Sequence, residues 1–496
     1  MSITLAQLES HLWEAANILR GPVDAADFKS YVFPLLFFKR LSDVHDEEYA
    51  AALAEFDHDE EAALFPENYS FQIPAECHWA DVRKVVTNVG LALQNAMRGI
   101  EQANPHTLYG IFGDAQWTNK DRLSDALLRD LIEHFSRLSL GNAAAKADVL
   151  GQSYEYLIKK FADATNKKAG EFYTPRSVVR LMVNMLDPRA GESIYDPTCG
   201  TGGMLLEAIH HVQETRDDVR TLWGKLYGQE KNLTTSAIAR MNLFLHGAAD
   251  FKIVRGDTLR NPAFFTGDDL ATFDCVIANP PFSLEKWGDD VWASDPYGRN
   301  FAGMPPAKSG DYAFVQHMLK SMAPKTGRMA VVLPHGALFR MGKEGEIRQK
   351  LLNMDMLEAV IGLGPNLFYG TGLAACILVF RHTKAKDRKH KVLIVDASKV
   401  FKTGRAQNEL LPEHVERIDG WVRNYVDVEG IARVVNLNEI AANDYNLNIP
   451  RYVEPSVTSE VLSVDEAMQR LRDSAQVAFA AEERLMQILK REGLLI

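Results

Sequence analysis

The sequence predicts an α/β protein in which helices cover both faces of a mostly parallel β-sheet, with an all-helical region before the sheet and a helical tail after it. Three observations favour this class. The N-terminal part has helical periodicity and few convincing strands. In the central part, short β-branched runs alternate with helical segments, which is typical of chains that build parallel sheets. The C-terminal part has the pattern of one long helix. The expected domains are residues 1–145, 146–455 and 456–496.

The composition is that of a folded protein with an acidic surface. The 496 residues are 46% apolar, which is enough for one large domain and one or two smaller ones. The formal net charge is -11, from 55 Lys and Arg against 66 Asp and Glu. This balance excludes a surface that is basic throughout, so a nucleic-acid substrate would require a partner that helps to hold it.

The cysteines and apolar runs indicate a reducing compartment. Cys77, Cys199, Cys275 and Cys376 lie far apart, and no histidine cluster has metal-ligand spacing, so neither a disulfide scaffold nor a metal site is expected. The N-terminus has no basic stretch followed by an apolar core, and runs such as residues 373–380 are too short to cross a bilayer. We expect a cytoplasmic protein without membrane attachment.

The helical region contains an apolar stripe at Phe28, Tyr31, Val32, Leu35 and Phe38. Its spacing predicts a helix that packs in a core rather than one that carries chemistry. Pro34 lies inside the stripe and predicts a kink or an interruption of that helix.

The central region contains a series of strand candidates separated by helical segments. They are residues 193–195, 225–227, 251–254, 273–278, 328–333, 357–361, 375–380 and 391–395. Sheets of this kind bind ligands beyond the carboxyl ends of their strands. The residues that directly follow each strand are therefore the candidates for chemistry.

The tail has the pattern of a coiled-coil helix. Ser463, with Glu466 three residues later, is typical of a helix start. Steps of four and three residues then separate the apolar positions, and Glu482 breaks the stripe once. These positions are Val464, Met468, Leu471, Ala475, Ala478, Leu485 and Leu489. The stripe either packs on the chain's own domain or docks on a partner, and the pattern leaves both open.

A glycine-rich turn follows the first strand candidate. Residues 196–204 are Asp-Pro-Thr-Cys-Gly-Thr-Gly-Gly-Met, where a strand ends and a helix begins. Glycines there permit a positive φ and let a bulky ligand approach the backbone. The segment lacks the Lys-Ser/Thr of a phosphate-binding loop and the Gly-x-Gly-x-x-Gly spacing of a dinucleotide site. Phosphate is therefore not the expected ligand.

Acidic residues follow the next two strand candidates, at Glu230 and Asp257. A carboxylate after the second strand can accept hydrogen bonds from both ribose hydroxyls, and one after the third can accept from an adenine amino group. Together with the glycine turn, they describe a pocket for a nucleoside that has a ribose and a base but no phosphate. S-adenosylmethionine fits this description.

The segment Asn279-Pro280-Pro281-Phe282 follows the apolar strand candidate 273–278 directly. An aromatic amine is a poor nucleophile because its lone pair is delocalised into the ring. The Asn279 side-chain oxygen and the Pro280 carbonyl are two acceptors that could face the amino hydrogens and help charge develop during attack. The prolines stiffen the backbone, and Phe282 can stack on a base taken out of its helix.

Together these residues resemble the amino-methyltransferases of the class I (Rossmann-like) fold. The wider sequence resembles HsdM, the modification subunit of type I restriction-modification systems and an N6-adenine DNA methyltransferase, over almost the whole chain. The likeness includes Phe-Pro-Leu-Leu-Phe-Phe-Lys-Arg-Leu at residues 33–41 and Gly-Glu-Phe-Tyr-Thr-Pro-Arg at residues 170–176. Residues 311–318 and 333–336 are also similar to the family.

The resemblance implies a role for each motif. In the family the upstream segment closes over the cofactor, which makes Glu171, Phe172, Tyr173, Thr174, Pro175 and Arg176 cofactor-binding. Read from the residues alone, this segment is only a turn that enters a helix at Pro175. The resemblance assigns Asp196, Gly200, Thr201 and Gly202 to the cofactor site, the last three at its methionine end, with Glu230 at its ribose and Asp257 at its adenine. Asn279, Pro280, Pro281 and Phe282 become the residues for the target base.

The reaction that follows is direct methyl transfer from S-adenosylmethionine to adenine N6, with no covalent enzyme intermediate and no metal. The implied partners are double-stranded DNA, a specificity subunit (HsdS) that selects the site, through it a second copy of this chain, and a restriction and translocation subunit (HsdR). No helicase phosphate-binding loop is present in this sequence, so cleavage belongs to another polypeptide. The tail is the candidate for docking on the specificity subunit.

Alternatives remain open at this stage. Enzymes that methylate a glutamine amide in protein use a similar Asn-Pro-Pro-aromatic segment, and N4 of cytosine asks for similar acceptors. A non-catalytic assembly subunit could also keep the fold. His317 and His335 lie in family-like stretches, but their spacing indicates no role, and we expect both to be structural histidines with satisfied hydrogen bonds.

Overall fold

The computed structural model describes residues 3–164, 174–215, 217–368, 371–405, 407–454 and 464–492. The chain divides into two compact units, Met1–Val453 and Glu454–Ile496. Among the helices described, none combines the length and the apolar character needed to cross a membrane.

The first unit begins with the helical region that the sequence predicts. Thr4 caps its first helix through a reciprocal pair of hydrogen bonds with Gln7, and Ser124 caps its sixth helix. The helices are α1 Leu5–Ile18, α2 Phe28–Glu55, α3 Glu60–Ala63, α4 Trp79–Arg83, α5 Val89–Ala103, α6 Asp125–Phe135 and α7 Ala147–Ala164.

Helix α2 runs through Pro34 without a break, so of the two alternatives predicted at this residue the interruption is wrong, and the kink stays a prediction. Proline inside a helix costs about 3 kcal/mol because a hydrogen bond is lost and the ring crowds the preceding turn. The neighbours Phe33 and Leu35 are buried, and each fully buried side chain of this size contributes about 1.5–3 kcal/mol. Burial along α2 therefore outweighs the cost of Pro34.

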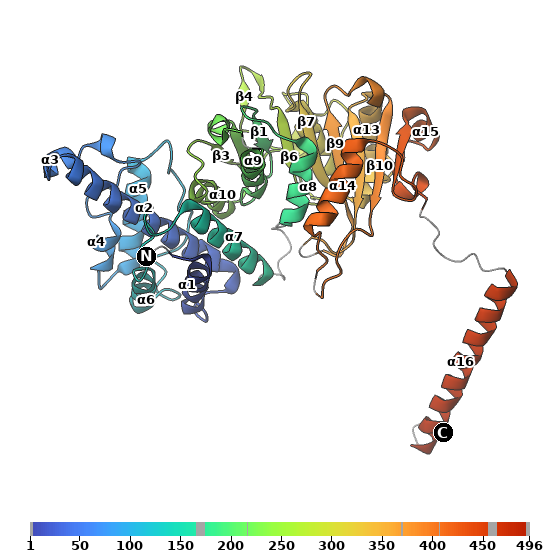
Figure 1. The fold of residues 1–496 in the computed structure, drawn as a ribbon, viewed down its shortest axis with the longest axis horizontal. Helices are drawn as coiled ribbons and strands as arrows, with labels where there is room; N and C mark the ends of the chain where they lie inside the picture. The colour runs from blue at the N-terminus through green and yellow to red at the C-terminus, as the bar shows by residue number, and fades with distance from the viewer. Residues whose placement is uncertain are drawn as a thin grey trace. The chain divides into compact units, whose positions relative to one another are not determined.

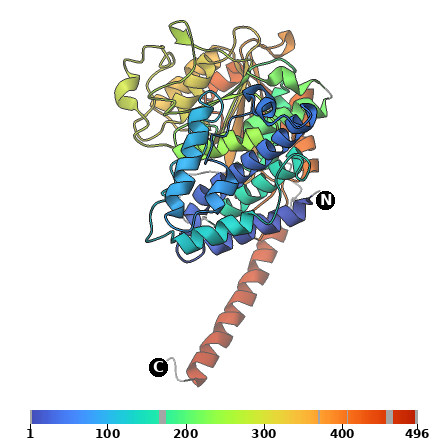
Figure 2. The same cartoon turned by 90° about the vertical axis from the view of Figure 1, so that its left-hand side faces the viewer.

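The core of the helical region extends beyond the helices that define it. It includes Ala237, Ile238, Met241 and Leu245 of α10 Leu233–Leu245, a helix that belongs by sequence to the sheet region. Helix α10 contacts both α2 and α7. In the view of Figure 2 the blue and cyan helices of this region lie in front of the sheet.

The described strands of the main sheet have the order β11-β10-β8-β9-β7-β6-β1-β2-β3. Every strand candidate from the sequence is confirmed, whereas β11 and the small β4-β5 hairpin were not predicted. The strands are β1 Ile194–Asp196, β2 Leu226–Glu230, β3 Lys252–Arg255, β4 Phe265–Thr266, β5 Asp269–Leu270, β6 Cys275–Ala278, β7 Arg328–Pro334, β8 Leu357–Leu363, β9 Ala375–Arg381, β10 Lys391–Ala397 and β11 Ala432–Asn436.

The sheet is mostly parallel, as predicted. Strands β3, β2, β1, β6 and β7 run in one direction, β9 is antiparallel to both of its neighbours, and β11 is antiparallel to β10. The chain passes from β1 outward to β2 and β3, then returns to place β6 on the other side of β1. The order therefore reverses between β1 and β6, which is the position where open α/β sheets bind ligands.

Helices cover both faces of this sheet (Figure 1). Alternate strand residues divide into two cores: Ile277 packs with α8, α9 and α14, whereas Val276 and Ala278 pack with α12, α13 and α15. Helices α8 and α14 lie side by side on one face (Figure 1). The helices are α8 Arg176–Leu186, α9 Gly203–Glu214, α11 Asp289–Trp292, α12 Asp311–Lys320, α13 Lys343–Asn353, α14 Pro412–Asn424 and α15 Leu437–Ala442.

The second unit contains the predicted tail helix, α16 Val464–Arg491. The apolar positions of the stripe from Val464 to Leu489 all fall within this helix. Ser463, the expected cap, lies outside the described residues.

Candidate active site

The carboxyl ends of four neighbouring strands carry the acidic and amide residues that the sequence singled out. Asp257 comes just after β3, Glu230 ends β2, Asp196 ends β1, and Asn279 follows β6. These strands are adjacent and parallel, in the order β3-β2-β1-β6. The four residues therefore lie side by side along one edge of the sheet. They span the point where the strand order reverses.

The glycine turn adopts the backbone conformation for which its glycines were singled out. Gly200 has φ 51° and Gly202 has φ 80°, in the left-handed region that favours glycine. A Cβ atom on Gly202 would lie 3.4 Å from the Ala239 carbonyl oxygen, whereas one on Gly200 would meet nothing within 4 Å. The backbone at Gly200 is therefore open on that side, while the turn is held from α10, where Asn242 Nδ2 donates to the Thr201 carbonyl at 3.0 Å.

Glu230 holds the same turn from the neighbouring strand. Its Oε2 accepts a hydrogen bond from the Gly200 N–H at 3.1 Å, and its Oε1 accepts one from the Asn232 N–H at 2.7 Å. The carboxylate thus joins the end of β2 to the glycine turn after β1. This arrangement keeps its oxygens at the strand edge where the sequence predicts a ribose.

Asp257 is held by its own loop. Its Oδ1 accepts from the N–H groups of Leu259 and Arg260, both at 3.2 Å, and its Oδ2 pairs with Lys231 Nζ at 2.9 Å. Lys231 is the residue after Glu230 in the chain. The side chain that pairs with one predicted cofactor acid therefore belongs to the direct neighbour of the other.

Asp196 is almost completely buried, at 2% exposure. Burial raises its pKa to about 8. Repulsion from the nearby Glu230 raises this pKa further, whereas the hydrogen bond from the Thr198 N–H lowers it because it favours the carboxylate. At neutral pH this carboxyl is therefore mostly protonated.

Asn279 presents a buried acceptor. Its Nδ2 donates to Thr174 Oγ1 at 2.8 Å, while its Oδ1 is buried and has no hydrogen-bond partner among the residues described. A buried polar atom without a partner is costly, and functional sites are where such atoms are found. Pro280 is buried beside it, and Phe282 is half-buried with its ring 5.9 Å from that of Phe368.

The upstream segment is brought to this site through Thr174. Pro175 occupies the N-cap position of α8, and Arg176, its first helical residue, forms an ion pair with Glu155 of α7. The other predicted residues of the segment, Glu171, Phe172 and Tyr173, lie outside the described residues.

Buried polar residues around the site were not predicted from the sequence. Asp311, at the start of α12, accepts a hydrogen bond from the Ser283 N–H just after Phe282. Arg299 is 2% exposed; it pairs with Asp295 at 2.7 Å and donates to the carbonyls of Thr258 and Leu259, next to Asp257. For Asp311, the available signal was its place at the start of the family-like stretch 311–318.

Of the two histidines expected to be structural with satisfied hydrogen bonds, His317 meets the expectation and His335 does not. His317 is structural, as expected: Arg299 donates to its Nδ1 at 3.4 Å, and its Nε2 lies 3.0 Å from the Tyr195 hydroxyl. Burial beside Arg299 lowers its pKa well below the ordinary value, so it stays neutral. His335 does not meet the expectation, because its Nε2 is buried without a hydrogen-bond partner in the described part of the chain.

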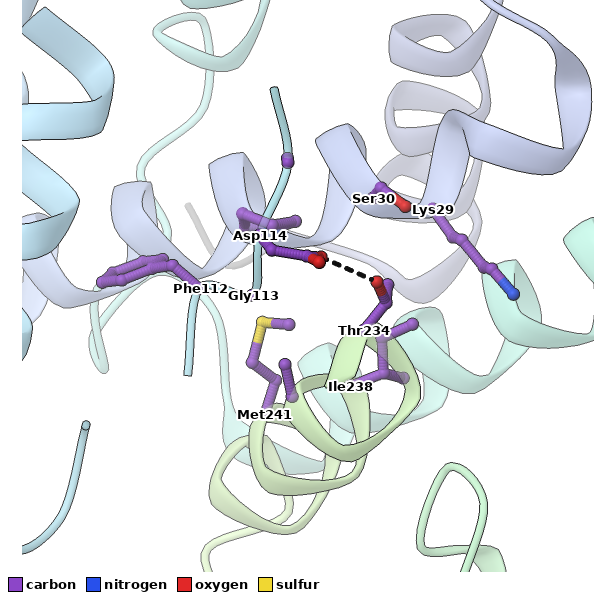
Figure 3. Close-up of a pocket in the computed structure, with 11 residues that line it drawn as sticks. Lys29, Ser30, Phe112, Gly113, Asp114, Thr234, Ile238 and Met241 are labelled. Carbon is purple, nitrogen blue, oxygen red and sulfur yellow. Dashed lines mark hydrogen bonds between the residues drawn. The ribbon is translucent and has the colours of Figure 1, made fainter. Parts of the chain in front are cut away.

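A small cavity elsewhere in the first unit is not this site. It lies where α10 meets residues 112–115 of the helical region, and Figure 3 shows Thr234 donating to Asp114 across it at 3.2 Å. Its volume is about 10 Å³, which is room for about one water molecule and not for a nucleoside.

Comparisons with known proteins place the chain in a family. A family model described as N-6 DNA methylase matches residues 145–461, and one described as the HsdM N-terminal domain matches residues 8–135. The type I restriction enzyme MjaVII methylase subunit of Methanocaldococcus jannaschii is 33% identical over 411 residues, covering 80% of this chain and 68% of that protein. The MjaVIII methylase subunit of the same organism is 32% identical and covers 93% of this chain and 80% of its own length.

A solved structure is similar over nearly the whole chain. The type I restriction-modification methyltransferase subunit from Streptococcus thermophilus superposes with a TM-score of 0.78 at 31% identity. The match covers 91% of this chain and 100% of that one. The predicted methyltransferase-type sheet and the N-terminal helical region are therefore both confirmed.

Proposed function

The chain belongs to the N-6 DNA methylase family, as a methylase subunit of type I restriction-modification systems, and on this premise we propose that residues 279–282 bind the target adenine. The reaction of the family is methylation of adenine N6 in DNA, which makes this chain an adenine-specific DNA methyltransferase. What remains to be assigned is which side chains carry the reaction.

The observation that carries the proposal is the buried Oδ1 of Asn279, directly after β6, which has no hydrogen-bond partner in the part of the chain that the structure describes. Because Nδ2 already donates to Thr174, the amide oxygen is the atom left to accept. An adenine amino group placed there would donate one hydrogen to Oδ1 and the other to the Pro280 carbonyl. Both acceptors would favour the charge that develops on N6 during attack.

Phe282 completes the base site in this proposal. A base within a duplex cannot reach a pocket at a sheet edge, so it must be extruded, and an aromatic ring then replaces part of the lost stacking. Phe282 is half-buried against Phe368, which supports its ring from one side. Pro280 and Pro281 keep the segment between Asn279 and Phe282 stiff.

We assign the remaining strand ends to S-adenosylmethionine. When bound, this cofactor supplies an electrophilic methyl group on a positively charged sulfur. The open backbone side of Gly200 fits a ligand that lies against the turn. In this assignment Gly200, Thr201 and Gly202 hold the methionine end, with Asp196 beside them, Glu230 accepts from the ribose, and Asp257 accepts from the adenine. Thr174, Pro175 and Arg176 belong to the segment that closes over the cofactor, together with Glu171, Phe172 and Tyr173.

We propose that the chain is divided into three parts. Residues 1–145 form the helical domain, 146–455 the methyltransferase domain and 456–496 the docking helix. We propose that α16 binds a helical specificity subunit, which selects the DNA site and joins two copies of this chain, and that a separate restriction subunit completes the assembly. Two features support this: an apolar stripe on α16 and a net charge of -11, which disfavours unaided DNA binding. The expected location is the cytoplasm.

The site assignment is tested by Asn279→Ala. Wild type and variant, each with the specificity subunit, are incubated with labelled S-adenosylmethionine and cognate DNA, and the labelled nucleoside is identified after digestion. Loss of an acceptor aimed at developing charge is expected to reduce label in N6-methyladenine by about 10²–10³-fold, with cofactor affinity nearly unchanged. An unimpaired variant would refute the role of Asn279. Label in cytosine or in protein would assign a different amino group to the site.

A further inference from the structure

We propose that Asp311 is a positioning residue, which fixes the exit of the segment 279–282 and thereby sets the geometry of the target base. The inference rests on the proposed role of that segment. It gives a function to the start of the family-like stretch 311–318, for which the sequence indicated none.

The exit of the base-binding segment has an uncommon backbone conformation. Ser283, directly after Phe282, has φ 49°, in the left-handed region that residues other than glycine rarely adopt. Its N–H donates to Asp311 Oδ1 at 2.7 Å. A strained turn of this kind persists only where the surroundings hold it, and the Asp311 carboxylate holds its backbone N–H here.

Arg340 closes this arrangement from a third segment. Its Nη1 donates to Asp311 Oδ2 at 3.0 Å, and its Nη2 donates to Ser283 Oγ at 3.2 Å. The side chain of Asp311 is 1% exposed, so the ion pair with Arg340 compensates for a charge that burial would otherwise disfavour. The same guanidinium thus contacts both the anchoring carboxylate and the residue that the carboxylate anchors.

The backbone next to Asp311 adds a second connection. The Gly310 N–H donates to the Leu284 carbonyl at 3.0 Å, so two successive residues of one segment hold two successive residues of the other. The approach is close: a Cβ atom on Gly310 would lie 2.9 Å from Cβ of Trp287. The start of α12 therefore lies directly against the turn that leaves the base site.

These contacts fix the end of the base-binding segment that the sheet does not hold. Asn279 is fixed at its entry by β6, whose residues are paired in the sheet. Because the two prolines make the backbone stiff, a shift at one end of the segment also moves its other end. If the exit at Ser283 is released, the stiff segment can pivot about the end of β6 and displace both Asn279 and Phe282. A displacement of about 1 Å in a reacting group can cost about 10²-fold in rate.

The test uses the full chain in complex with its specificity subunit. Asp311→Ala removes the acceptor for the Ser283 N–H, whereas Asp311→Asn keeps one oxygen for it. Single-turnover methylation of cognate DNA is measured per cofactor-binding site, so that unfolded protein is not counted. A duplex with 2-aminopurine at the target adenine reports by fluorescence whether the base stacks in the site.

We expect Asp311→Ala to lower the single-turnover rate by about 10²-fold and to change the 2-aminopurine signal, with cofactor affinity within about twofold of wild type. Asp311→Asn should recover most of that loss. The matched control is Gln316→Met on the same helix, which removes buried hydrogen bonds to Ala302 and Gly303 but none to residues 279–283. This control should lower stability without changing the rate per site.

Three results would overturn the proposal: an unchanged rate for Asp311→Ala, an Asp311→Asn variant as impaired as Asp311→Ala, or an equal loss for Gln316→Met. If Asp311→Ala does not fold, Arg340→Gln replaces it, since this side chain is 35% exposed, and its expected loss is about tenfold. The Asn279→Ala variant in the same assay separates the two proposals. A slow Asn279→Ala with a normal Asp311→Ala refutes only the positioning role, and a normal Asn279→Ala refutes the site itself.

Discussion

Asn279 Nδ2 donates a hydrogen bond to Thr174 Oγ1 at 2.8 Å, between residues 105 positions apart in the chain. One partner follows β6, and the other lies two residues before the start of α8. Because the amide nitrogen is engaged, the amide oxygen is left as the buried acceptor for the base. This bond links the proposed cofactor-closing segment to the proposed catalytic amide, so the orientation of one depends on the position of the other.

Thr174→Val is expected to slow methyl transfer, because Asn279 loses the acceptor that orients its amide. A neutral hydrogen bond contributes about 0.5–1.5 kcal/mol, which corresponds to a loss of about two- to twelvefold in single-turnover rate. Thr174→Ser keeps the hydroxyl and should be close to wild type. Equal rates for the valine and serine variants would show that this bond does not orient Asn279.

Glu230→Ala is expected to weaken S-adenosylmethionine binding before it affects the rate of the bound complex. The carboxylate both faces the proposed ribose and holds the Gly200 N–H, so its loss removes a ligand contact and loosens the turn. A loss of about 10–10²-fold in affinity, measured by calorimetry, follows from hydrogen bonds to a charged group of about 1.5–3 kcal/mol. Glu214→Ala, which removes a surface ion pair with Arg180, is the control that should leave affinity unchanged. Tight binding by Glu230→Ala would contradict the ribose assignment.

Cofactor affinity is expected to rise with pH through the titration of Asp196. Its carboxyl has a pKa of about 8 because it is buried, so at neutral pH the proton is mostly bound. A positively charged ligand favours the carboxylate and lowers this pKa, so binding releases a proton and strengthens as pH increases toward 8. The dissociation constant should fall by up to about tenfold per pH unit between about pH 6 and pH 8. In Asp196→Asn this dependence should be lost; if that variant keeps the wild-type slope, another group is responsible.

Arg299→Ala is expected to destabilise the folded chain strongly. Its guanidinium is buried against Asp295 and donates to two carbonyls beside Asp257. The alanine variant would leave all of these acceptors without their hydrogen bonds from this side chain. Removing one partner of a buried ion pair costs about 3–5 kcal/mol, which urea unfolding followed by circular dichroism can measure. Arg260→Ala removes an exposed pair with Asp290 and should cost no more than about 1 kcal/mol. A similar small loss for Arg299→Ala would mean that its network contributes little.

Deleting residues 456–496 is expected to abolish co-purification with the specificity subunit while cofactor binding is retained. Within the stripe on α16, Leu471→Asp and Leu485→Asp should have the same effect, because a charge would enter an apolar helix contact. Gln487→Asp, outside the stripe, is the matched control and should assemble normally. Assembly that survives both the deletion and the stripe substitutions would place the subunit contact elsewhere.

The strands and the two motifs could be predicted because their signals are local. The strand before Asn279 is a continuous apolar run, and the glycine turn before α9 requires backbone conformations that few residue types adopt. Both therefore appear in the residue types themselves. For the same reason the placement of Asp196, Glu230 and Asp257 at one sheet edge could be predicted, since each of them comes after a strand candidate, whereas their order along that edge was not predicted.

Other features depend on contacts that no local pattern records. Asp311 is distant in sequence from Ser283 and from Arg340, so its carboxylate looks like any helix-start acid until the fold brings the three together. The antiparallel direction of β9 is set by its pairing with β7 and β8, and an apolar run does not reveal strand direction. The helix is not interrupted at Pro34, because burial against other helices offsets the cost of the proline, and this burial is not visible in the local sequence.

The shared core of the helical region has a consequence for biosynthesis. Ala237, Ile238, Met241 and Leu245 of α10 pack with helices that emerge from the ribosome long before them. Chains elongate at about 5–20 residues per second, so for some seconds the parts of α2 and α7 that α10 contacts are synthesised but not yet covered by it. The core of the N-terminal region therefore cannot be completed until α10 has been synthesised. Until α10 is made, the apolar side chains that it will cover stay exposed, and transiently exposed apolar surface of this kind favours aggregation.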